Sequence, residues 1–265
     1  MLNSMELDRF LGDYYKFDEF DDYCVNGMVV EGKQEIGKMV FGVSYNAPFL
    51  EAAVKAGADA ILVHHGIFRK GLFSVKGIHR NKLQTLLNRD ISLFGIHLPM
   101  DAHPENGHNA LLLKAAGLRQ MEPLKWGFFG FNDSKRSLSA ILKSLHDYLH
   151  PEGFGYNDAS VGSAFNQDQK WGFTVLGNGP EVPEKVFMAS GGSTDLYEDA
   201  VALGADTFIC GAIKEHIPAE SLETNTNFVN LGHYYSEKPG ILALMDLISE
   251  KFGIETEYIE IHNPV

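Results

Sequence analysis

Residues 38–65 read KMVFGVSYNAPFLEAAVKAGADAILVHH, and this stretch decides the fold class. The apolar runs at 38–44 and 59–65 predict buried strands, and residues 48–58 between them predict a helix that stops near a glycine. The same rhythm continues along the chain with a helix, a strand and a helix at 79–90, 91–97 and 109–117. Strands and helices that alternate in this way indicate an α/β fold with a largely parallel sheet.

A later stretch, KVFMASGGSTDLYEDAVALGADTFICGA at 185–212, aligns with 38–65 without a gap. Seven residues are identical in the two copies: Lys38/Lys185, Glu51/Glu198, Ala53/Ala200, Val54/Val201, Gly57/Gly204, Ala58/Ala205 and Asp59/Asp206. Farther on, 91–101 aligns with 227–237, which pairs His97 with His233 and Asp101 with Glu237. We therefore predict an internal duplication that gives two similar α/β lobes, about 1–124 and about 125–265, related by a pseudo-two-fold axis.

Histidines and carboxylates follow three of the predicted strands, as the pairs His64 with His65, His97 with Asp101, and His233 with Glu237. In open α/β sheets, ligands bind outside the carboxyl ends of the strands, and histidines with carboxylates suit zinc, iron or manganese. The second copy carries Gly211-Ala212 in place of the paired histidines, so the fold does not require histidines there. The pattern predicts a divalent-metal site, with Gly211 and Ala212 expected to leave an open side for a ligand.

The adjacent histidines favour two metal ions over one. Neighbouring residues in a strand point to opposite faces, so we expect His64 and His65 each to serve a different ion. Glu237 could then bridge the two ions, and Asp101 would bind one of them. Each pair also has a simpler interpretation as ordinary surface or core residues. Ser236 and Pro239, for example, suit the start of a helix, where a glutamate would only favour the helix dipole.

Composition excludes several functions. The formal net charge of −13 argues against nucleic-acid binding, because an acidic surface repels phosphate backbones. Neither a Walker-type phosphate loop nor a GxGxxG fingerprint is present, so ATP and NAD are not implied. No apolar run approaches the roughly 18–20 residues that span a bilayer. The acidic, aromatic N-terminus lacks the features of a signal peptide, so we expect a cytoplasmic protein with Cys24 and Cys210 as reduced, structural thiols.

Six stretches carry a resemblance to a known family: NGMVVEG (26–32), GADAILVHHG (57–66), GIHLPMDAHPENGHNA (95–110), ASGGS (189–193), GHYYSEKPGI (232–241) and IEIHNPV (259–265). Through them the chain resembles the NIF-three-like (NGG1-interacting-factor-three) family, which includes the bacterial YbgI-type proteins. The resemblance runs in family order over nearly the whole chain. It implies two similar α/β lobes with a dinuclear divalent-metal site between them, and a ring-like homohexamer.

The resemblance also implies a set of metal ligands: His64, His65, Asp101, His233 and Glu237. His97 matches a family histidine beside the site that is not a primary ligand. Together with His103 it is a candidate to orient a ligand or move a proton, although a loop-capping role fits His103 equally well. One departure is Ala212, because the family often has a glutamate after the glycine at this point.

Two functions of different classes fit these residues. Members of the family are described as GTP cyclohydrolase I type 2 homologues, which implies a metal-dependent hydrolase that acts on a nucleotide-like small molecule. The alternative is a metal-binding or metallocofactor-delivery protein that has no turnover of its own. Arg69, Lys70 and Arg80 could contact a phosphate group, although ordinary surface charges are the preferred interpretation. The sequence assigns no catalytic side chain.

Overall fold

The computed structural model describes residues 1–66, 74–151, 173–261 and 263, which fold into two compact units. Unit 1 contains Met1–Met100 and Gly240–Asn263, and unit 2 contains Asp101–Pro239. Each unit has its own sheet with helices on it, so the predicted α/β class is confirmed. The units differ in extent from the lobes predicted at about 1–124 and 125–265, because the last helix and strand of the chain belong to unit 1. The predicted lobe bounds delimit the two copies of an internal duplication, which the compact units do not test, so these bounds stay a prediction.

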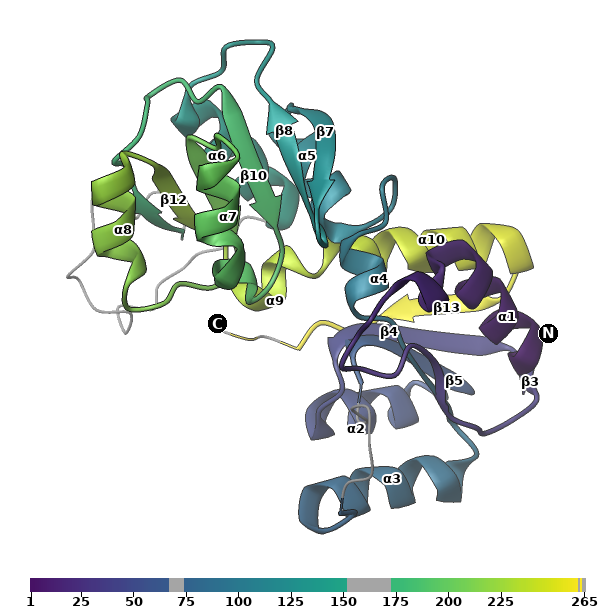
Figure 1. Cartoon of the computed structure of the whole chain (residues 1–265). Helices are drawn as coiled ribbons and strands as arrows, with labels where there is room; N and C mark the ends of the chain where they lie inside the picture. The colour runs from purple at the N-terminus through teal and green to yellow at the C-terminus, as the bar shows by residue number, and fades with distance from the viewer. Residues whose placement is uncertain (67–73, 152–172, 262, 264–265) are drawn as a thin grey trace. The chain divides into compact units, whose positions relative to one another are not determined.

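The sheet of unit 1 has five strands in the order β13-β4-β5-β6-β2 (Figure 1). Their bounds are β2 Gly27–Val30, β4 Lys38–Ser44, β5 Ala60–His65, β6 Ser92–Gly95 and β13 Glu255–Tyr258. Strands β13, β4, β5 and β6 are parallel, and β2 pairs antiparallel with β6. The apolar runs of β4 and β5 are buried on both faces, which is typical of parallel strands. The strands predicted at 38–44 and 59–65 are confirmed.

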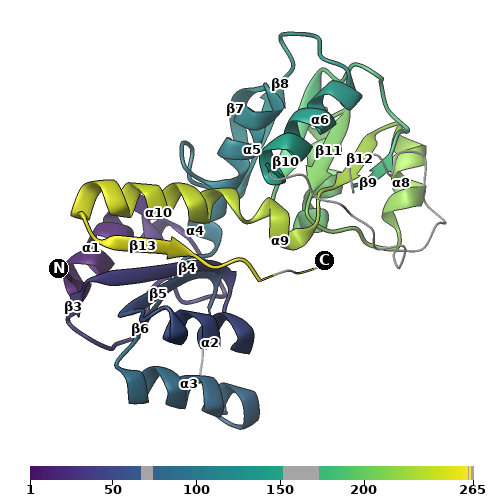
Figure 2. The ribbon, with the colours of Figure 1, turned by 180° about the vertical axis from the view of Figure 1, so that it is seen from behind.

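Helices cover both faces of this sheet (Figures 1 and 2). Their bounds are α1 Ser4–Tyr15, α2 Ala47–Lys55, α3 Gly77–Arg89 and α10 Pro239–Phe252. Alternate residues of the strands point to opposite faces, so Phe41 and Leu62 pack with α1 and α10, whereas Val40 and Ile61 pack with α2 and α3. A short pair, β1 Leu2–Asn3 with β3 Glu35–Ile36, and the 3-10 turn η1 Phe17–Glu19 complete the unit. The helix α4 Leu98–Asp101 leads into unit 2.

The sheet of unit 2 has six strands in the order β7-β8-β10-β11-β12-β9. Their bounds are β7 Arg119–Leu124, β8 Gly127–Phe131, β9 Thr174–Leu176, β10 Lys185–Ala189, β11 Thr207–Cys210 and β12 Asn227–Asn230. The three central strands β10, β11 and β12 are parallel, and β8 and β9 pair antiparallel with the outer two of them. The helical elements are α5 His108–Ala116, α6 Leu138–Leu149, η4 Ser193–Leu196, α7 Tyr197–Ala202, α8 Ile217–Thr224 and α9 His233–Ser236.

The hydrogen-bond ladders correct one predicted alignment. Met39 pairs with Ala60 in unit 1, and the aligned Val186 pairs with Thr207 in unit 2. On the next strand, Ala60 pairs with Ser92 and Thr207 pairs with Asn227. Matching the strands by their ladders therefore relates Ser92 to Asn227, whereas the sequence alignment relates Ser92 to Phe228. The strands are thus offset by one residue from the predicted alignment, because two short apolar strands align almost equally well in either register. The pairing of His97 with His233 and of Asp101 with Glu237 lies beyond the ladders and stays a prediction.

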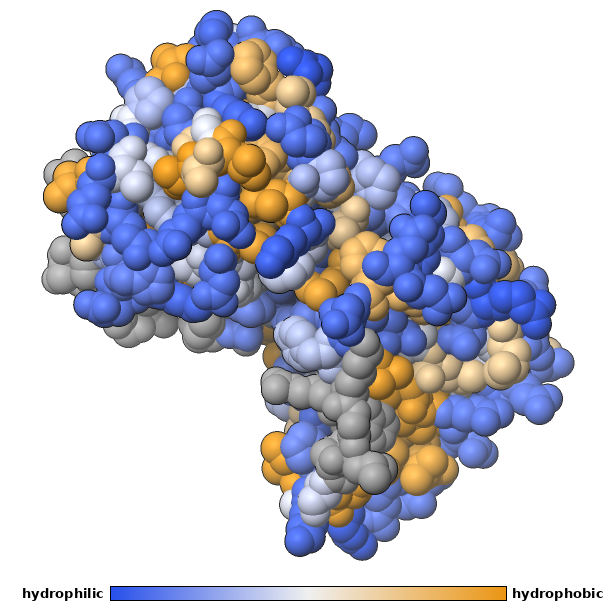
Figure 3. Space-filling model, in the orientation of Figure 1, coloured by the Kyte–Doolittle hydropathy of each residue, from blue (hydrophilic) through white to orange (hydrophobic). Residues whose placement is uncertain are grey.

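The surface is largely polar. On the face shown in Figure 3, hydrophilic residues predominate and hydrophobic residues form smaller patches. Among the described residues, no helix combines the length and apolar character needed to cross a bilayer.

Candidate metal centre

Three histidines of unit 1 gather where two neighbouring strands end. His64 and His65 are the last residues of β5, and His97 follows β6 by two residues. The ring centroid of His64 lies 4.6 Å from that of His65 and 4.9 Å from that of His97. The centroids of His65 and His97 are 5.8 Å apart. One ligand nitrogen from each ring lies within 4.8 Å of the other two. We call these three residues the histidine cluster.

The closeness of His64 and His65 overturns one step of the sequence reasoning. Neighbouring side chains leave a strand in opposite directions, but side chains in strands also lean along the strand, and here the two ring centroids lie only 4.6 Å apart. The expectation that neighbouring histidines must serve two separate ions therefore loses its geometric basis. Two ions per chain are what the family resemblance implies.

Each ring of the histidine cluster has its Nδ1 atom engaged by a neighbour. The distances are 2.9 Å from His64 Nδ1 to the carbonyl oxygen of Ile96, 3.1 Å from His65 Nδ1 to Oγ of Ser44, and 2.9 Å from His97 Nδ1 to Oδ1 of Asp22. Carbonyl and carboxylate oxygens only accept, so Nδ1 of His64 and His97 carries the proton and Nε2 carries the lone pair. Metal-binding histidines are held in this way in most proteins. The cluster thus fits a divalent ion by its chemistry.

Asp22 is the buried carboxylate behind His97. Its Oδ1 accepts hydrogen bonds from His97 Nδ1 and from the backbone N–H of Cys24, and its Oδ2 accepts from Asn26 Nδ2 and the N–H of Leu98. Burial alone would raise the pKa of Asp22, but the hydrogen bonds from His97 and Cys24 outweigh it and lower the pKa to about 2. Asp22 is therefore ionised at neutral pH. Sequence reasoning missed it, because it lies in an acidic run with no motif.

The candidate ligands of unit 2 include a histidine and a carboxylate on one helical turn. His233 is the first residue of α9 and Glu237 is its C-cap. Their side chains lie on the same side of the turn, with His233 Nε2 3.1 Å from Glu237 Oε1. Glu237 is only 3% exposed. A buried carboxylate beside an imidazole is a suitable pair of ligands for a divalent cation.

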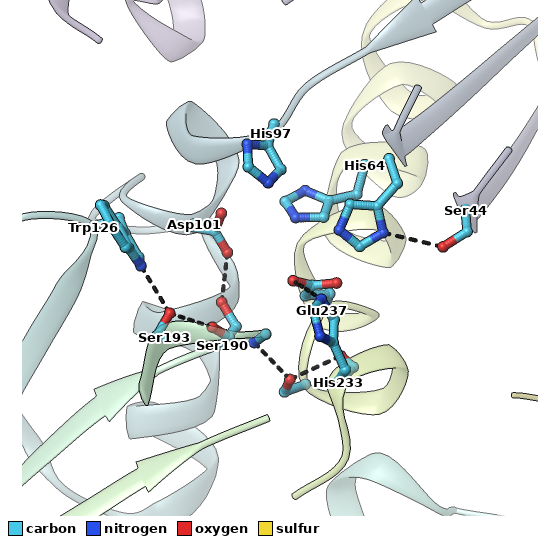
Figure 4. A network of polar contacts seen from close by, with 12 residues as sticks. Ser44, His64, His97, Asp101, Trp126, Ser190, Ser193, His233 and Glu237 are labelled. Carbon is cyan, nitrogen blue, oxygen red and sulfur yellow. Dashed lines mark hydrogen bonds and ion pairs between the residues drawn. The ribbon is translucent and has the colours of Figure 1, made fainter. Parts of the chain in front are cut away.

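The third candidate of unit 2, Asp101, is held by the loop that follows β10. The hydroxyl of Ser190 donates to Oδ1 of Asp101 at 2.5 Å (Figure 4). Both side chains are buried. The next residue, Gly191, has φ of +59°, and a Cβ atom there would clash with Oε1 of Glu237. The ASGGS stretch that carried part of the family resemblance therefore lies against the candidate ligands.

Gly211 does not leave the open side that its small size suggested. A Cβ atom at Gly211 would meet Oγ of Ser236 and would lie 2.9 Å from both Gly191 N and His233 Cα. Glycine is needed because the backbone of the ASGGS loop and α9 approach closely here. Ala212 is half-buried, and its carbonyl oxygen accepts a hydrogen bond from Thr194 Oγ1 at 2.8 Å.

The remaining candidates have simpler roles or fall outside the structure. Nδ1 of His103 accepts the backbone N–H groups of Glu105 and Asn106, so this ring caps a turn. Arg80 is exposed on α3. Arg69 and Lys70 lie outside the described residues.

Fold and donor chemistry together define an α/β protein with candidate metal ligands in each of its units. The chain belongs to the Duf34/NIF3 (NGG1p interacting factor 3) family, whose model matches residues 2–264. The resemblance drawn from the sequence motifs is confirmed.

Relatives and solved structures of similar proteins cover the whole chain. A protein of Escherichia coli K12 named GTP cyclohydrolase 1 type 2 homolog is 35% identical over 99% of this chain and 100% of its own length. A solved structure described as protein ybgI, of unknown function, has a TM-score of 0.85 at 31% identity and covers 100% of both chains. A protein of Thermus thermophilus has a TM-score of 0.83 at 25% identity, also over 100% of both chains.

Proposed function

We propose that this protein binds two divalent metal ions through His64, His65, Asp101, His233 and Glu237, the ligand set that the family resemblance implies. The observation that carries the proposal is the arrangement of the histidine cluster, in which every Nδ1 is engaged by a second residue. An imidazole fixed in this way has a defined orientation and presents its other nitrogen to an ion. Zinc, iron and manganese all suit these ligands.

We further propose that the bound ions support hydrolysis of a nucleotide-like small molecule. Two divalent ions would supply Lewis acidity and would activate a water molecule. The name GTP cyclohydrolase 1 type 2 homolog, carried by the Escherichia coli relative, supports a purine nucleotide as the first substrate to test. The chain's own contribution is to hold the site: Asp22 orients His97 beside the proposed ligands, and Ser190 of the ASGGS loop bonds to the proposed ligand Asp101.

Turnover of GTP tests the hydrolase directly. Protein freed of metal and reconstituted with zinc, iron(II) or manganese should open or hydrolyse GTP, and chromatography of the nucleotide measures the product. His64→Ala should abolish turnover, whereas His146→Ala should keep it, because His146 lies on α6 and its ring packs against His150 and Phe173, neither of which is a proposed ligand. Metal binding without GTP turnover in any of the three forms would contradict the GTP hydrolase and favour the metal-delivery alternative. Equal turnover in His64→Ala would exclude this site.

We also propose the internal duplication, which matched hydrogen bonds in the two units support. Oδ2 of Asp59 accepts the N–H groups of Gly37 and Lys38 at 3.0 and 3.2 Å. Oδ2 of Asp206 accepts the N–H groups of Glu184 and Lys185 at 2.6 and 3.3 Å. These residues correspond at the same offset in the sequence, and such a carboxylate bridge between the start of one strand and the turn before the next is a specific feature to repeat.

The homohexamer implied by the resemblance and the cytoplasmic location inferred from the N-terminal composition remain predictions. Light scattering on purified protein tests the assembly. A mass close to that of one 29.4 kDa chain at micromolar concentration would contradict a hexamer.

A further inference from the structure

The segment that follows β10 lies against every candidate ligand of unit 2. It consists of Ser190, Gly191 and Gly192 with Ser193, the first residue of η4, and we call it the positioning loop. Ser190 bonds to Asp101, and Gly191 leaves no room for a side chain between itself and Glu237. A Cβ atom on Gly191 would also lie only 3.2 Å from Nε2 of His233. One short loop thus packs against one carboxylate, a second carboxylate and an imidazole.

The hydrogen bond from Ser190 to Asp101 distinguishes the two oxygens of the carboxylate. The O–H group donates to Oδ1 at 2.5 Å, a length typical of a hydroxyl bonded to an ionised carboxylate. Ser190 is 3% exposed and Asp101 is 4% exposed, so water competes little for this bond. A carboxylate held through Oδ1 is restrained in its rotation. Oδ2 is then the oxygen that is set to bind a metal ion.

The position of Ser190 is itself fixed by a network of hydrogen bonds, of which Figure 4 shows the part that runs from Trp126 through Ser193. Trp126 Nε1 donates to Ser193 Oγ at 2.8 Å, and Ser193 Oγ donates to the carbonyl oxygen of Ser190 at 2.6 Å. Asn109 completes the network: its Nδ2 donates to the carbonyl oxygens of Asp101 and Trp126, and its Oδ1 accepts the N–H of Ser190. The backbone of Ser190 is therefore tied on both sides of its side chain.

The same loop also holds the first turn of α9. The N–H of Gly191 donates to Ser236 Oγ at 3.0 Å, and Ser236 Oγ donates to the carbonyl oxygen of His233 at 2.9 Å. Gly191 can make this approach because its φ of +59° lies in the region that favours glycine. A shift of the loop would therefore move His233 and Glu237 as well as Asp101.

We propose that Ser190 is a positioning residue for metal binding, whose hydroxyl turns the Asp101 carboxylate so that Oδ2 faces the ion. The rest of the positioning loop holds Ser190 in place and keeps α9 in register with it. This inference rests on the proposed metal-binding function. It goes beyond the ligand set by assigning a role to the ASGGS motif, which contributes none of the proposed metal ligands.

Metal affinity of matched serine variants tests the proposal. The full-length protein is freed of metal and titrated with zinc against a chromogenic chelator, without any substrate. Ser190→Ala should weaken zinc binding by about 10- to 100-fold, the usual effect of removing a residue that orients a ligand. Ser221→Ala is the control, because Ser221 is a similarly buried serine of unit 2 whose hydroxyl donates to the carbonyl oxygen of Thr226 and accepts from Nδ2 of Asn178, neither of which is a proposed ligand. It should bind zinc as the wild type does.

Ser193→Ala distinguishes the effect of the Ser190 hydroxyl on zinc affinity from the effect of an ordered positioning loop. This change removes the bonds to Trp126 and to the Ser190 carbonyl but leaves the Ser190 hydroxyl on Asp101. It should weaken zinc binding less than Ser190→Ala does. Equal losses in the two variants, or a Ser190→Ala affinity equal to that of Ser221→Ala, would overturn the positioning role. Failure of the wild type to bind zinc, iron(II) or manganese would instead overturn the proposed function itself.

Trp126 gives a second measurement that needs no metal-affinity fit. Its indole N–H is joined to Asp101 through Ser193 and Ser190, so a change at the carboxylate should alter its fluorescence. In a Trp171→Phe background, which leaves Trp126 as the sole tryptophan, zinc should shift the emission of the wild type. The shift should be lost in Ser193→Ala. An unchanged shift in that variant would contradict the proposed network.

Discussion

Nδ1 of His97 lies 2.9 Å from Oδ1 of Asp22, and both side chains are buried. Asp22 also accepts the backbone N–H of Leu98, so one carboxylate fixes both the ring of His97 and the chain that follows it. The bond requires a proton on Nδ1 and leaves the lone pair of His97 on Nε2, which lies 3.2 Å from the hydroxyl of Tyr23. Asp22 therefore sets which nitrogen of His97 carries the lone pair within the histidine cluster.

Asp22→Asn should disturb the histidine cluster without removing any of its rings. The amide can present N–H to His97 and thereby change the favoured tautomer, so ¹⁵N shifts of the His97 ring should change in the metal-free protein. Zinc affinity should fall, because the ring of His97 lies 4.9 Å from that of the proposed ligand His64. Asp59→Asn is a matched control in unit 1, because Asp59 also accepts two backbone N–H groups but contacts no histidine of the cluster. Identical ring shifts in wild type and Asp22→Asn would contradict this role.

The same residue should make stability depend on pH in acid. Burial would raise the pKa of Asp22, but its hydrogen bonds lower it from 3.8 to about 2 in the folded protein. A carboxyl with a lowered folded pKa stabilises the protein above its unfolded pKa, and this stabilisation is lost as pH falls through the folded pKa. The urea midpoints of wild type and Asp22→Asn should differ above about pH 4 and converge towards about pH 2. Parallel midpoints over this range would contradict the assignment.

The two cysteines should react very differently with alkylating reagents. Cys210 is 1% exposed, and burial raises the pKa of its thiol to about 12. Cys24 is half-buried. Because only a thiolate reacts at a useful rate, iodoacetamide at neutral pH should modify Cys24 and spare Cys210 until the protein is unfolded. Mass spectrometry of proteolytic fragments locates the modification. Rapid labelling of Cys210 in native protein would show that its surroundings open.

Gly191→Ala should impair metal binding more than its backbone strain explains. A side chain at Gly191 is strained by the positive φ and also clashes with the carboxylate of Glu237. Gly204→Ala is the matched control, since Gly204 has φ of +90° in the same unit but an added Cβ meets nothing within 4 Å. Both changes should cost about 1–2 kcal/mol of stability from backbone strain. Only Gly191→Ala should also weaken zinc binding, and equal affinities in the two variants would contradict the packing argument.

The sequence predicted the centre of each sheet better than its edges. Strands β4 and β5 and the helix α2 between them were found because their apolar runs and glycine stop signal are unambiguous. The return of α10 and β13 to unit 1 was not found, because an amphipathic helix in sequence does not say which sheet it covers. The sequence alignment of β12 with β6, which belong to different sheets, was off by one residue, since short apolar strands carry little information on register.

The sequence was enough to propose candidate ligands but not the residues that support them. His64 and His65 were found because they end an apolar strand, where α/β folds place their sites. Asp22, Asn109 and Ser190 were not singled out, because each acts through a tertiary contact that no local pattern records. Ser190 had one usable signal, its place directly after β10.

Elemental analysis of reconstituted protein tests the central claim most directly. Metal-free protein is loaded with a slight excess of zinc, iron(II) or manganese, passed through a desalting column and measured for metal and protein. We expect two ions per chain in the wild type, a loss of both in Glu237→Ala if this carboxylate bridges them, and a loss in His64→Ala that His146→Ala does not share. A plateau near one ion per chain would contradict the dinuclear site, and no retained metal in any form would contradict the metal-binding function.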